Sequence, residues 1–322
     1  MAWVIFFIII AILLALDLGV FHKSDEPVSM KDSLKWTAIW IGIALVFGGA
    51  IYWIYEYDLF GLDKHGLTGK KALVEYYTGY VIEESLSLDN IFVIAMIFKY
   101  FKIPPMYQHR ILFWGIIGAV FFRLIMIVLG AAFVEKFDWA MYVFGGILVL
   151  SALKMLKKED DNEDFKKSLG VRLLSKVYRI DWTIMNGKYI DVVNGKKVAT
   201  SLFATLIVVE FSDILFAIDS IPAIFSVTKE PFIVFTSNIF AILGLRNLYF
   251  FLSNMIDKFK YVKFALIAVL LFVGLKMIFH HQLPILSEQT WISLVIILGL
   301  LTLGVIASLI ITEKEEHDAH EI

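Results

Sequence analysis

Two short stretches of the chain place carboxylates inside long apolar segments. The first reads Glu83-Glu84-Ser-Leu-Ser-Leu-Asp89-Asn90, and the second reads Glu210-Phe-Ser-Asp213-Ile-Leu-Phe-Ala-Ile-Asp219-Ser220-Ile-Pro222. An ionised side chain at the centre of a transmembrane helix costs about 2.5–3.5 kcal/mol to insert, so embedded acids of this kind usually serve a function. The two stretches therefore indicate both a membrane fold and a candidate site.

The composition of the whole chain agrees with a membrane protein. Hydrophobic residues make up 59% of its 322 residues and charged residues 19%, against about half and a quarter in an average globular domain. A bilayer core needs roughly 20 apolar residues per helix. Nine segments qualify, near residues 2–21, 36–55, 73–98, 111–134, 139–156, 200–226, 232–252, 261–279 and 290–311. We therefore predict an all-α, polytopic membrane protein with nine transmembrane helices.

The distribution of Lys and Arg predicts how the helices are oriented. Most basic residues lie in the links after the first, third, fifth and seventh spans, above all in the link 157–199. Since cytoplasmic loops carry the excess of Lys and Arg, we expect the N-terminus outside and the C-terminus in the cytoplasm. Two Asn-Gly pairs, Asn186-Gly187 and Asn194-Gly195, predict a small hairpin within this link.

The chain also contains an internal repeat. The pattern Glu83-x5-Asp89 aligns with Asp213-x5-Asp219, and Arg123 aligns with Arg246. Each unit has three spans, so the second copy must run in the opposite direction, as in many secondary carriers whose sites lie at the repeat interface. We therefore divide the chain into two leading helices (1–72), a first repeat (73–156), a cytoplasmic linker (157–199), a second repeat (200–281) and a last helix with an acidic tail (282–322).

The embedded charge is mostly negative. The acids of the two stretches face only two mid-span arginines, Arg123 and Arg246, which we interpret as counter-ions. A surplus of anions favours a cation pathway. The candidate ligands are Glu83, Glu84, Asp89, Asn90, Glu210, Asp213 and Asp219, with Asp17 near the end of the first span as a further acid. We expect Asp89 and Asp219 to hold one divalent cation, with Glu83 and Asp213 nearby.

The ligand types narrow the choice of metal. Oxygen donors dominate both stretches, the chain has no Cys, and its seven His residues lie at span ends, in links or in the tail. Such a site suits Mg²⁺, Ca²⁺ or Mn²⁺ better than Zn²⁺ or Cu⁺. Pro222 cannot donate a hydrogen bond to the carbonyl of Ile218. We therefore expect the sixth span to bend or open near Asp219 and to expose further oxygen ligands.

Three other interpretations remain open. The acids and arginines could lock helices together without any ligand, since buried ion pairs occur without a functional reason. An intramembrane enzyme is disfavoured because no His-Glu-x-x-His or Gly-x-Ser-x-Gly pattern occurs, and we predict that the chain is not an enzyme. A membrane assembly factor that delivers metal to exported proteins could dock partners on the basic linker. The net charge of −2 argues against nucleic acid.

At these residues the chain resembles the TerC/Alx family of bacterial inner-membrane proteins. The resemblance rests on the two acidic stretches and extends to Ser237-Asn238-Ile-Phe-Ala-Ile-Leu-Gly-Leu-Arg246 and to Leu16-Asp17-Leu-Gly-Val-Phe-His22. It implies Mn²⁺ export, with the ion as cargo and no permanently bound cofactor. We expect proton exchange to drive it. The resemblance also implies a link to alkaline-pH stress and tellurite resistance, so a carrier of protons or another cation is an alternative. Expected partners are the lipid bilayer and a second copy of the chain or an export-machinery protein.

Overall fold

The computed structural model describes residues 1–21, 30–63, 66–137, 139–156, 164–253, 261–282 and 289–320. The side chains of residues 17–21 and 313–320 lie outside this description. Candidate residue Asp17 is therefore placed only by its backbone, which belongs to the first helix.

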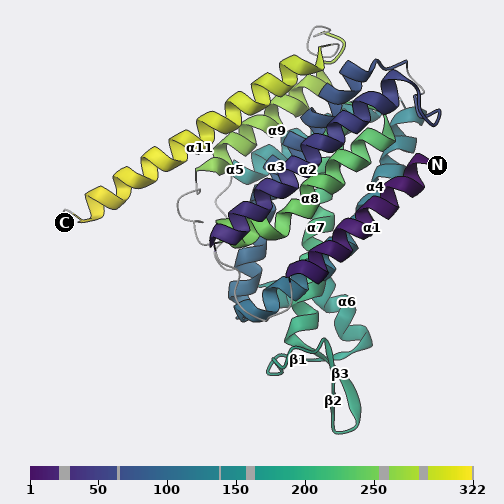
Figure 1. Ribbon diagram of the computed structural model, residues 1–322. Coiled ribbons are helices and arrows are strands. Elements are labelled where there is room, and N and C mark those ends of the chain that lie inside the picture. Colours follow the sequence, from purple (N-terminus) through teal and green to yellow (C-terminus); the bar gives the residue numbers. More distant parts are fainter. Residues whose placement is uncertain are drawn as a thin grey trace.

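Long helices make up most of the described chain (Figure 1). They are α1 (Ala2–Phe21), α2 (Met30–Glu56), α3 (Gly69–Tyr100), α4 (Pro105–Lys136), α5 (Ala140–Leu156), α7 (Ser201–Phe225), α8 (Pro231–Leu252), α9 (Val262–Ile278) and α11 (Thr290–His320). Each coincides with one of the predicted spans, and α11 continues well beyond its expected end at 311. The predicted all-α membrane fold is confirmed.

Five of these helices are both long and apolar enough to cross a membrane: α2, α4, α7, α8 and residues 290–312 of α11. Residues 2–16 of α1 and all of α5 form shorter apolar helices. The outward surfaces carry large apolar side chains such as Val46 of α2, Leu129 of α4 and Leu303 of α11. In a membrane these side chains meet lipid tails rather than water, which explains their exposure.

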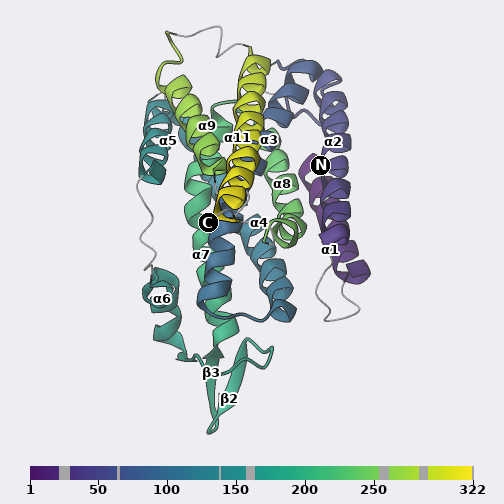
Figure 2. The ribbon, with the colours of Figure 1, turned by 90° about the vertical axis from the view of Figure 1, so that its left-hand side faces the viewer.

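The helix packing follows the two-fold repeat. In the repeat, α3 corresponds to α7, α4 to α8 and α5 to α9. The contact between α3 and α8 is therefore equivalent to the contact between α4 and α7, and both contacts are extensive. The equivalent helices α5 and α9 lie side by side (Figure 2). They approach closely at two glycines, since a Cβ atom on Gly145 would lie 2.8 Å from the carbonyl oxygen of Gly274. Small residues allow such close helix contacts in membranes.

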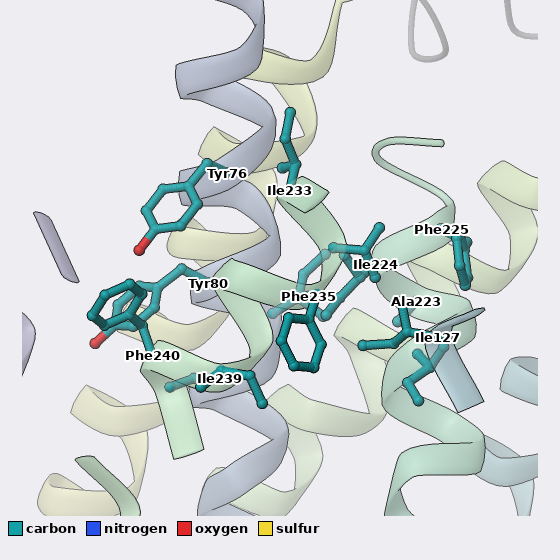
Figure 3. Packing of buried hydrophobic residues seen from close by; sticks show 14 of the residues in the cluster. Tyr76, Tyr80, Ile127, Ala223, Ile224, Phe225, Ile233, Phe235, Ile239 and Phe240 are labelled. Carbon is teal, nitrogen blue, oxygen red and sulfur yellow. The ribbon is translucent and has the colours of Figure 1, made fainter. Parts of the chain in front are cut away.

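The core lies around α8, which is buried along its whole membrane-spanning length. Aromatic and branched side chains of α3, α7 and α8 fill it, including Tyr76, Ile224, Phe235 and Phe240 (Figure 3). The same cluster takes in Ile127 of α4. Because α8 is enclosed by other helices, any polar side chain on it must find its partners inside the protein.

The expected opening of the sixth span is wrong. α7 stays helical from Ser201 to Phe225, through both Asp219 and Pro222. Pro222 lies only three residues before the end of α7, and its carbonyl accepts a hydrogen bond from the backbone N–H of Ser226. The helix tolerates the missing N–H of Pro222 because the turns on either side stay helical.

A small module interrupts the helices between α5 and α7. It contains a 3₁₀ turn (Phe165–Lys167), helix α6 (Leu169–Val177) and strands β1 (Arg179–Asp181), β2 (Ile190–Val193) and β3 (Lys196–Thr200). The sheet order is β1-β3-β2, with β1 parallel and β2 antiparallel to β3. Asn194 and Gly195 join β2 to β3 with φ angles of 51° and 76°, as a type I′ hairpin turn requires. The predicted hairpin is confirmed, whereas α6 and β1 were not predicted.

Candidate cation site

The guanidinium of Arg123 on α4 lies at the centre of a buried polar cluster. Its Nη1 donates to Glu83 Oε1 of α3 and, at 3.0 Å, to Asn238 Oδ1 of α8. Its Nη2 and Nε donate to the two carboxylate oxygens of Asp213 on α7, at 3.0 and 3.3 Å. A longer contact of 3.4 Å reaches Ser220 Oγ. Four oxygen-bearing side chains therefore surround one cationic group, and we call these five residues the central cluster.

The cluster joins the two repeats. Glu83 and Asp213 are equivalent positions, and each comes from the first helix of its repeat. Asn238 strengthens the link, because its Nδ2 donates to Glu83 Oε2 at 2.8 Å. Arg123, Glu83 and Asn238 are fully buried, and only the Asp213 side chain keeps some exposure, 17%. One buried and one partly exposed carboxylate share one guanidinium, so the cluster carries a net negative charge when both acids are ionised.

A small crevice leads to Asp213. It holds about 30 Å³ and is lined by Gly115, Ala119, Val209 and Leu245, among others. This volume suffices for a water molecule. Ile94 of α3 and Leu245 of α8 also line the crevice. Each lies toward the end of its helix that is nearer the sheet module. The crevice therefore approaches the cluster from the module's side.

Two further predicted acids lie near the cluster in sequence but make other contacts. The carboxylate of Glu210 packs directly against Gly118 of α4, where any Cβ atom would overlap it. Glu84 lies beside Tyr80, one helical turn away on α3. Each of these acids has a buried Oε2 atom that finds no hydrogen-bond partner among the described residues. Buried carboxylate oxygens rarely remain unbonded, so both atoms are candidates for contact with a cation or a proton.

The remaining predicted residues are distributed over the neighbouring helix faces. Asp219 accepts a hydrogen bond of 2.6 Å from Ser151 of α5 and lies near Lys154. Asn90 and Arg246 are buried, and Asp89 is partly exposed. Among the described residues, no three His, Asp or Glu side chains converge as a metal site. The structure therefore brings together Glu83, Asp213 and Arg123 from the predicted set.

The chain is similar to known membrane proteins over most of its length. The model of the family described as "Integral membrane protein TerC family" matches residues 68–316. The chain belongs to the TerC family. It is 44% identical over 308 residues to an uncharacterized membrane protein of Myxococcus xanthus, covering 96% of this chain and 92% of that protein.

Two other similar proteins carry a more specific name. Proteins of Salmonella typhi and Escherichia coli, each named "Putative membrane-bound redox modulator Alx", are 41% and 39% identical, over 94% of this chain and 92% of each relative. No solved structure matches the chain.

This TerC chain has a second buried polar cluster, at the end of the bundle opposite the sheet module. It borders a cavity of about 760 Å³ lined by Glu75, Thr228, Glu230 and Lys276, among others. Glu75 is 4% exposed, and in the part of the chain that the structure describes its buried Oε2 atom has no hydrogen-bond partner. Lys276 is also buried and donates to Ser293 of α11 at 3.0 Å.

An apolar layer separates this cavity from the central cluster. Three residues form this layer, and each lies about one helical turn from a member of the central cluster, toward the cavity. They are Gly79 (four residues from Glu83), Ile127 (four from Arg123) and Ile224 (four from Ser220). All three are buried, and Gly79 packs so closely that a Cβ atom there would lie 2.8 Å from Ser237 Oγ. Figure 3 shows Ile127 and Ile224 within this packing. The layer closes the bundle between the cavity and the cluster.

The sequence patterns did not indicate three polar residues of this TerC chain: Asn238, Glu75 and Ser151. The internal repeat could not indicate Asn238, because the equivalent position eight residues before Arg123 is Gly115. Glu75 breaks the repeat in the same way, since the residue eight positions before Asp213 is Thr205. Ser151 lies on a span without an acid, and no pattern marked it. The quoted Ser237-Asn238 pair was the only signal present for Asn238, as a polar pair inside an apolar span.

Proposed function

We propose that this protein is a secondary transporter that exports a divalent metal cation, Mn²⁺ in particular, in exchange for protons. The observation that carries the proposal is the central cluster. Equivalent acids of the two repeats, Glu83 and Asp213, converge on one buried guanidinium at the repeat interface. Secondary carriers built from inverted repeats bind their substrates at this place.

The donor set around Arg123 suits a hard cation. All the acceptors that the guanidinium contacts are oxygens, from the two carboxylates, the Asn238 amide and the Ser220 hydroxyl. Carboxylate, carbonyl and water ligands suit Mg²⁺, Ca²⁺ and Mn²⁺. Arg123 thus takes the place of a cation between the two acids. In the proposed cycle, a dication displaces the guanidinium and neutralises Glu83 and Asp213 together.

Proton exchange follows from the same charges. After the cation leaves, two buried carboxylates need positive charge, because an unpaired buried anion is costly. Arg123 supplies one charge, and a proton on one carboxyl supplies the other. Metal and protons therefore compete for the same atoms, and this competition couples their movements in opposite directions.

The two openings give the cation a path. The crevice beside Asp213 leads toward the module's side, and the large cavity opens at the other end. If the basic linker lies in the cytoplasm of a bacterium, the crevice is the entrance and the cavity the exit. We propose this orientation in the inner membrane, with Met1 outside. Movement of one repeat against the other would open the layer at Gly79, Ile127 and Ile224.

We place the cation between Glu83 and Asp213 rather than between Asp89 and Asp219. The first two share their contacts at Arg123, whereas Asp219 points to Ser151 of α5. Asp89, Asp219, Glu84 and Glu210 then serve as further acids along the route. This chain has no cysteine, so the name of its Alx relatives, redox modulator, does not lead us to propose thiol–disulfide exchange by its side chains.

Transport by the purified chain tests the proposal. The full-length protein is reconstituted in sealed vesicles, and the influx of Mn²⁺, Mg²⁺, Ca²⁺ and Zn²⁺ is measured with and without a pH gradient. We expect Mn²⁺ flux that an opposing proton gradient accelerates, and little Zn²⁺ flux. Vesicles whose Mn²⁺ flux equals that of protein-free vesicles would contradict the proposal. A membrane assembly factor that only docks exported proteins would also give a Mn²⁺ flux equal to that of protein-free vesicles.

A further inference from the structure

Helix α6 has an apolar surface that is wider than its contact with the rest of the protein. One side of the helix packs on α7, with Val171 and Leu174 buried. Gly170 approaches α7 so closely that a Cβ atom there would lie 2.8 Å from the ring of Phe211. Next to this side lie Leu169, Leu173 and Val177, spaced four residues apart and 68%, 52% and 74% exposed. We call these three residues the apolar stripe.

The other side of α6 is basic. A groove of about 660 Å³ runs between α6 and strand β1, and all the charged residues that line it in the described part of the chain are Lys or Arg: Lys166, Arg172, Lys176 and Arg179. Trp182 also lines the groove, with the Lys166 ammonium 5.0 Å from the centre of its ring. We call this the basic groove. It combines positive charge with an aromatic ring, as the interfacial region of a membrane protein does.

Two contacts fix α6 and the strand that follows it beside the membrane-spanning bundle. Gly170 meets Ile207 and Phe211, which lie in the first half of the membrane-spanning helix α7. Trp182 stacks on Phe101 at the end of α3, with ring centroids 5.5 Å apart and an interplanar angle of 7°. α6 therefore lies beside the first half of α7, at the end of the bundle that carries the sheet module, as Figures 1 and 2 show. Because α7 is long and apolar enough to cross a membrane, this end of α7 would lie near one membrane surface.

We infer that α6 is an interfacial amphipathic helix that binds an anionic phospholipid. The apolar stripe lies in the acyl-chain boundary, and the basic groove holds the phosphate of the headgroup. Charge decides the occupant, because every charged residue that lines the groove in the described part of the chain is Lys or Arg, and such a groove attracts anionic rather than zwitterionic headgroups. An amphipathic helix of this kind lies in the interface and does not cross the bilayer. The inference is independent of the ion that the central cluster takes.

The position of the stripe can be measured with spin labels. The chain has no native cysteine, so Leu173→Cys labels the stripe, and Ser175→Cys labels the exposed polar side of the same helix. The full-length variants are placed in lipid nanodiscs, and label accessibility to oxygen and to a water-soluble nickel complex is compared. We expect the label at 173 to favour oxygen and the label at 175 to favour nickel. Equal nickel accessibility at both positions would overturn the inference.

The lipid class is tested by titration. Detergent-purified protein is titrated with short-chain phosphatidylglycerol, phosphatidylcholine and inorganic phosphate, and bound lipid is counted by native mass spectrometry. Each basic contact contributes roughly fivefold in affinity. We therefore expect the double variant Arg172→Glu, Lys176→Glu to weaken phosphatidylglycerol binding by at least about 25-fold. The control is the double variant Lys196→Glu, Lys197→Glu, at exposed positions of β3, which should leave the binding unchanged. Equal binding of phosphatidylcholine, displacement by free phosphate, or equal loss in both variants would contradict the inference.

Discussion

Arg123 of α4 donates to Glu83 of α3, and both side chains are fully buried. The same guanidinium holds Asp213 from the other repeat at 3.0 Å. A buried ion pair is weak evidence for stability by itself, because desolvation offsets much of the attraction. In this protein the Arg123 guanidinium holds equivalent acids of the two repeats, Glu83 and Asp213, next to each other. Removing one member leaves the others charged and buried.

Arg123→Ala is expected to destabilise the protein strongly. It leaves Glu83 and Asp213 without their shared cation, and breaking a buried pair in this way costs about 3–5 kcal/mol. Arg123→Lys keeps the charge but cannot reach all the oxygens, so we expect an intermediate loss. Thermal unfolding in detergent measures the effect. Arg179→Ala, at an exposed position, is the control. A melting temperature of Arg123→Ala equal to that of this control would contradict the central position of Arg123.

Gly118→Ala is expected to disturb Glu210. The carboxylate of Glu210 occupies the space where the new methyl group would lie, so it must move or the helices must separate. Gly146→Ala is the matched control, because nothing lies within 4 Å of its Cβ position. Replacing a helical glycine by alanine there adds about 0.5–1 kcal/mol of stability. The melting temperature should therefore fall in the first variant and stay or rise in the second. A change of melting temperature in the same direction in both variants would show that Glu210 does not pack against Gly118.

Labelling of single cysteines tests the proposed orientation. The chain lacks cysteine, so Lys196→Cys in the hairpin and Tyr57→Cys at the opposite end of the bundle are unique and exposed targets. We expect a membrane-impermeant maleimide to label position 57 in intact cells and position 196 only after permeabilisation. The reverse pattern would invert the proposed topology and exchange the entrance with the exit.

The long-range pattern of polar residues was predictable, and the local contacts were not. Apolar run length predicted the helices, because a helix must satisfy its own backbone groups in lipid. The repeat predicted that Glu83 and Asp213 belong together, and the arginine count predicted a counter-ion. Neither signal predicted that Arg123 rather than Arg246 holds both acids, or that Asn238 supports Glu83. These contacts depend on helix rotation and side-chain length, which spacing along one chain does not determine.

Pro222 shows why one expectation was wrong. A proline removes one hydrogen bond, and a helix usually kinks where neighbouring turns cannot compensate. Pro222 lies three residues before the end of α7, and its missing N–H does not interrupt the helix at Asp219. The spacing of Pro222 from Asp219 is visible in the sequence, but the continuation of the helix through both residues is not.

Asp219→Asn is expected to reduce Mn²⁺ flux without loss of folding. The amide oxygen of asparagine can still accept the hydrogen bond from Ser151 that Asp219 accepts at 2.6 Å, so only the charge is lost. Ser151→Ala keeps the charge and removes the hydrogen bond, and we expect a milder effect. Flux in vesicles at matched protein content compares the two. A larger loss in Ser151→Ala would show that position matters more than charge.

Mn²⁺ flux through the paired variants Glu83→Gln and Asp213→Asn tests the central claim most directly. Both changes keep side-chain size and remove the charges that Arg123 now balances. Uptake is measured in proteoliposomes, and the melting temperature of each variant shows that it is folded. We predict that folded single variants lose at least about tenfold in Mn²⁺ flux and that the double variant is inactive. Near-normal flux from a folded double variant would contradict a cation site between Glu83 and Asp213.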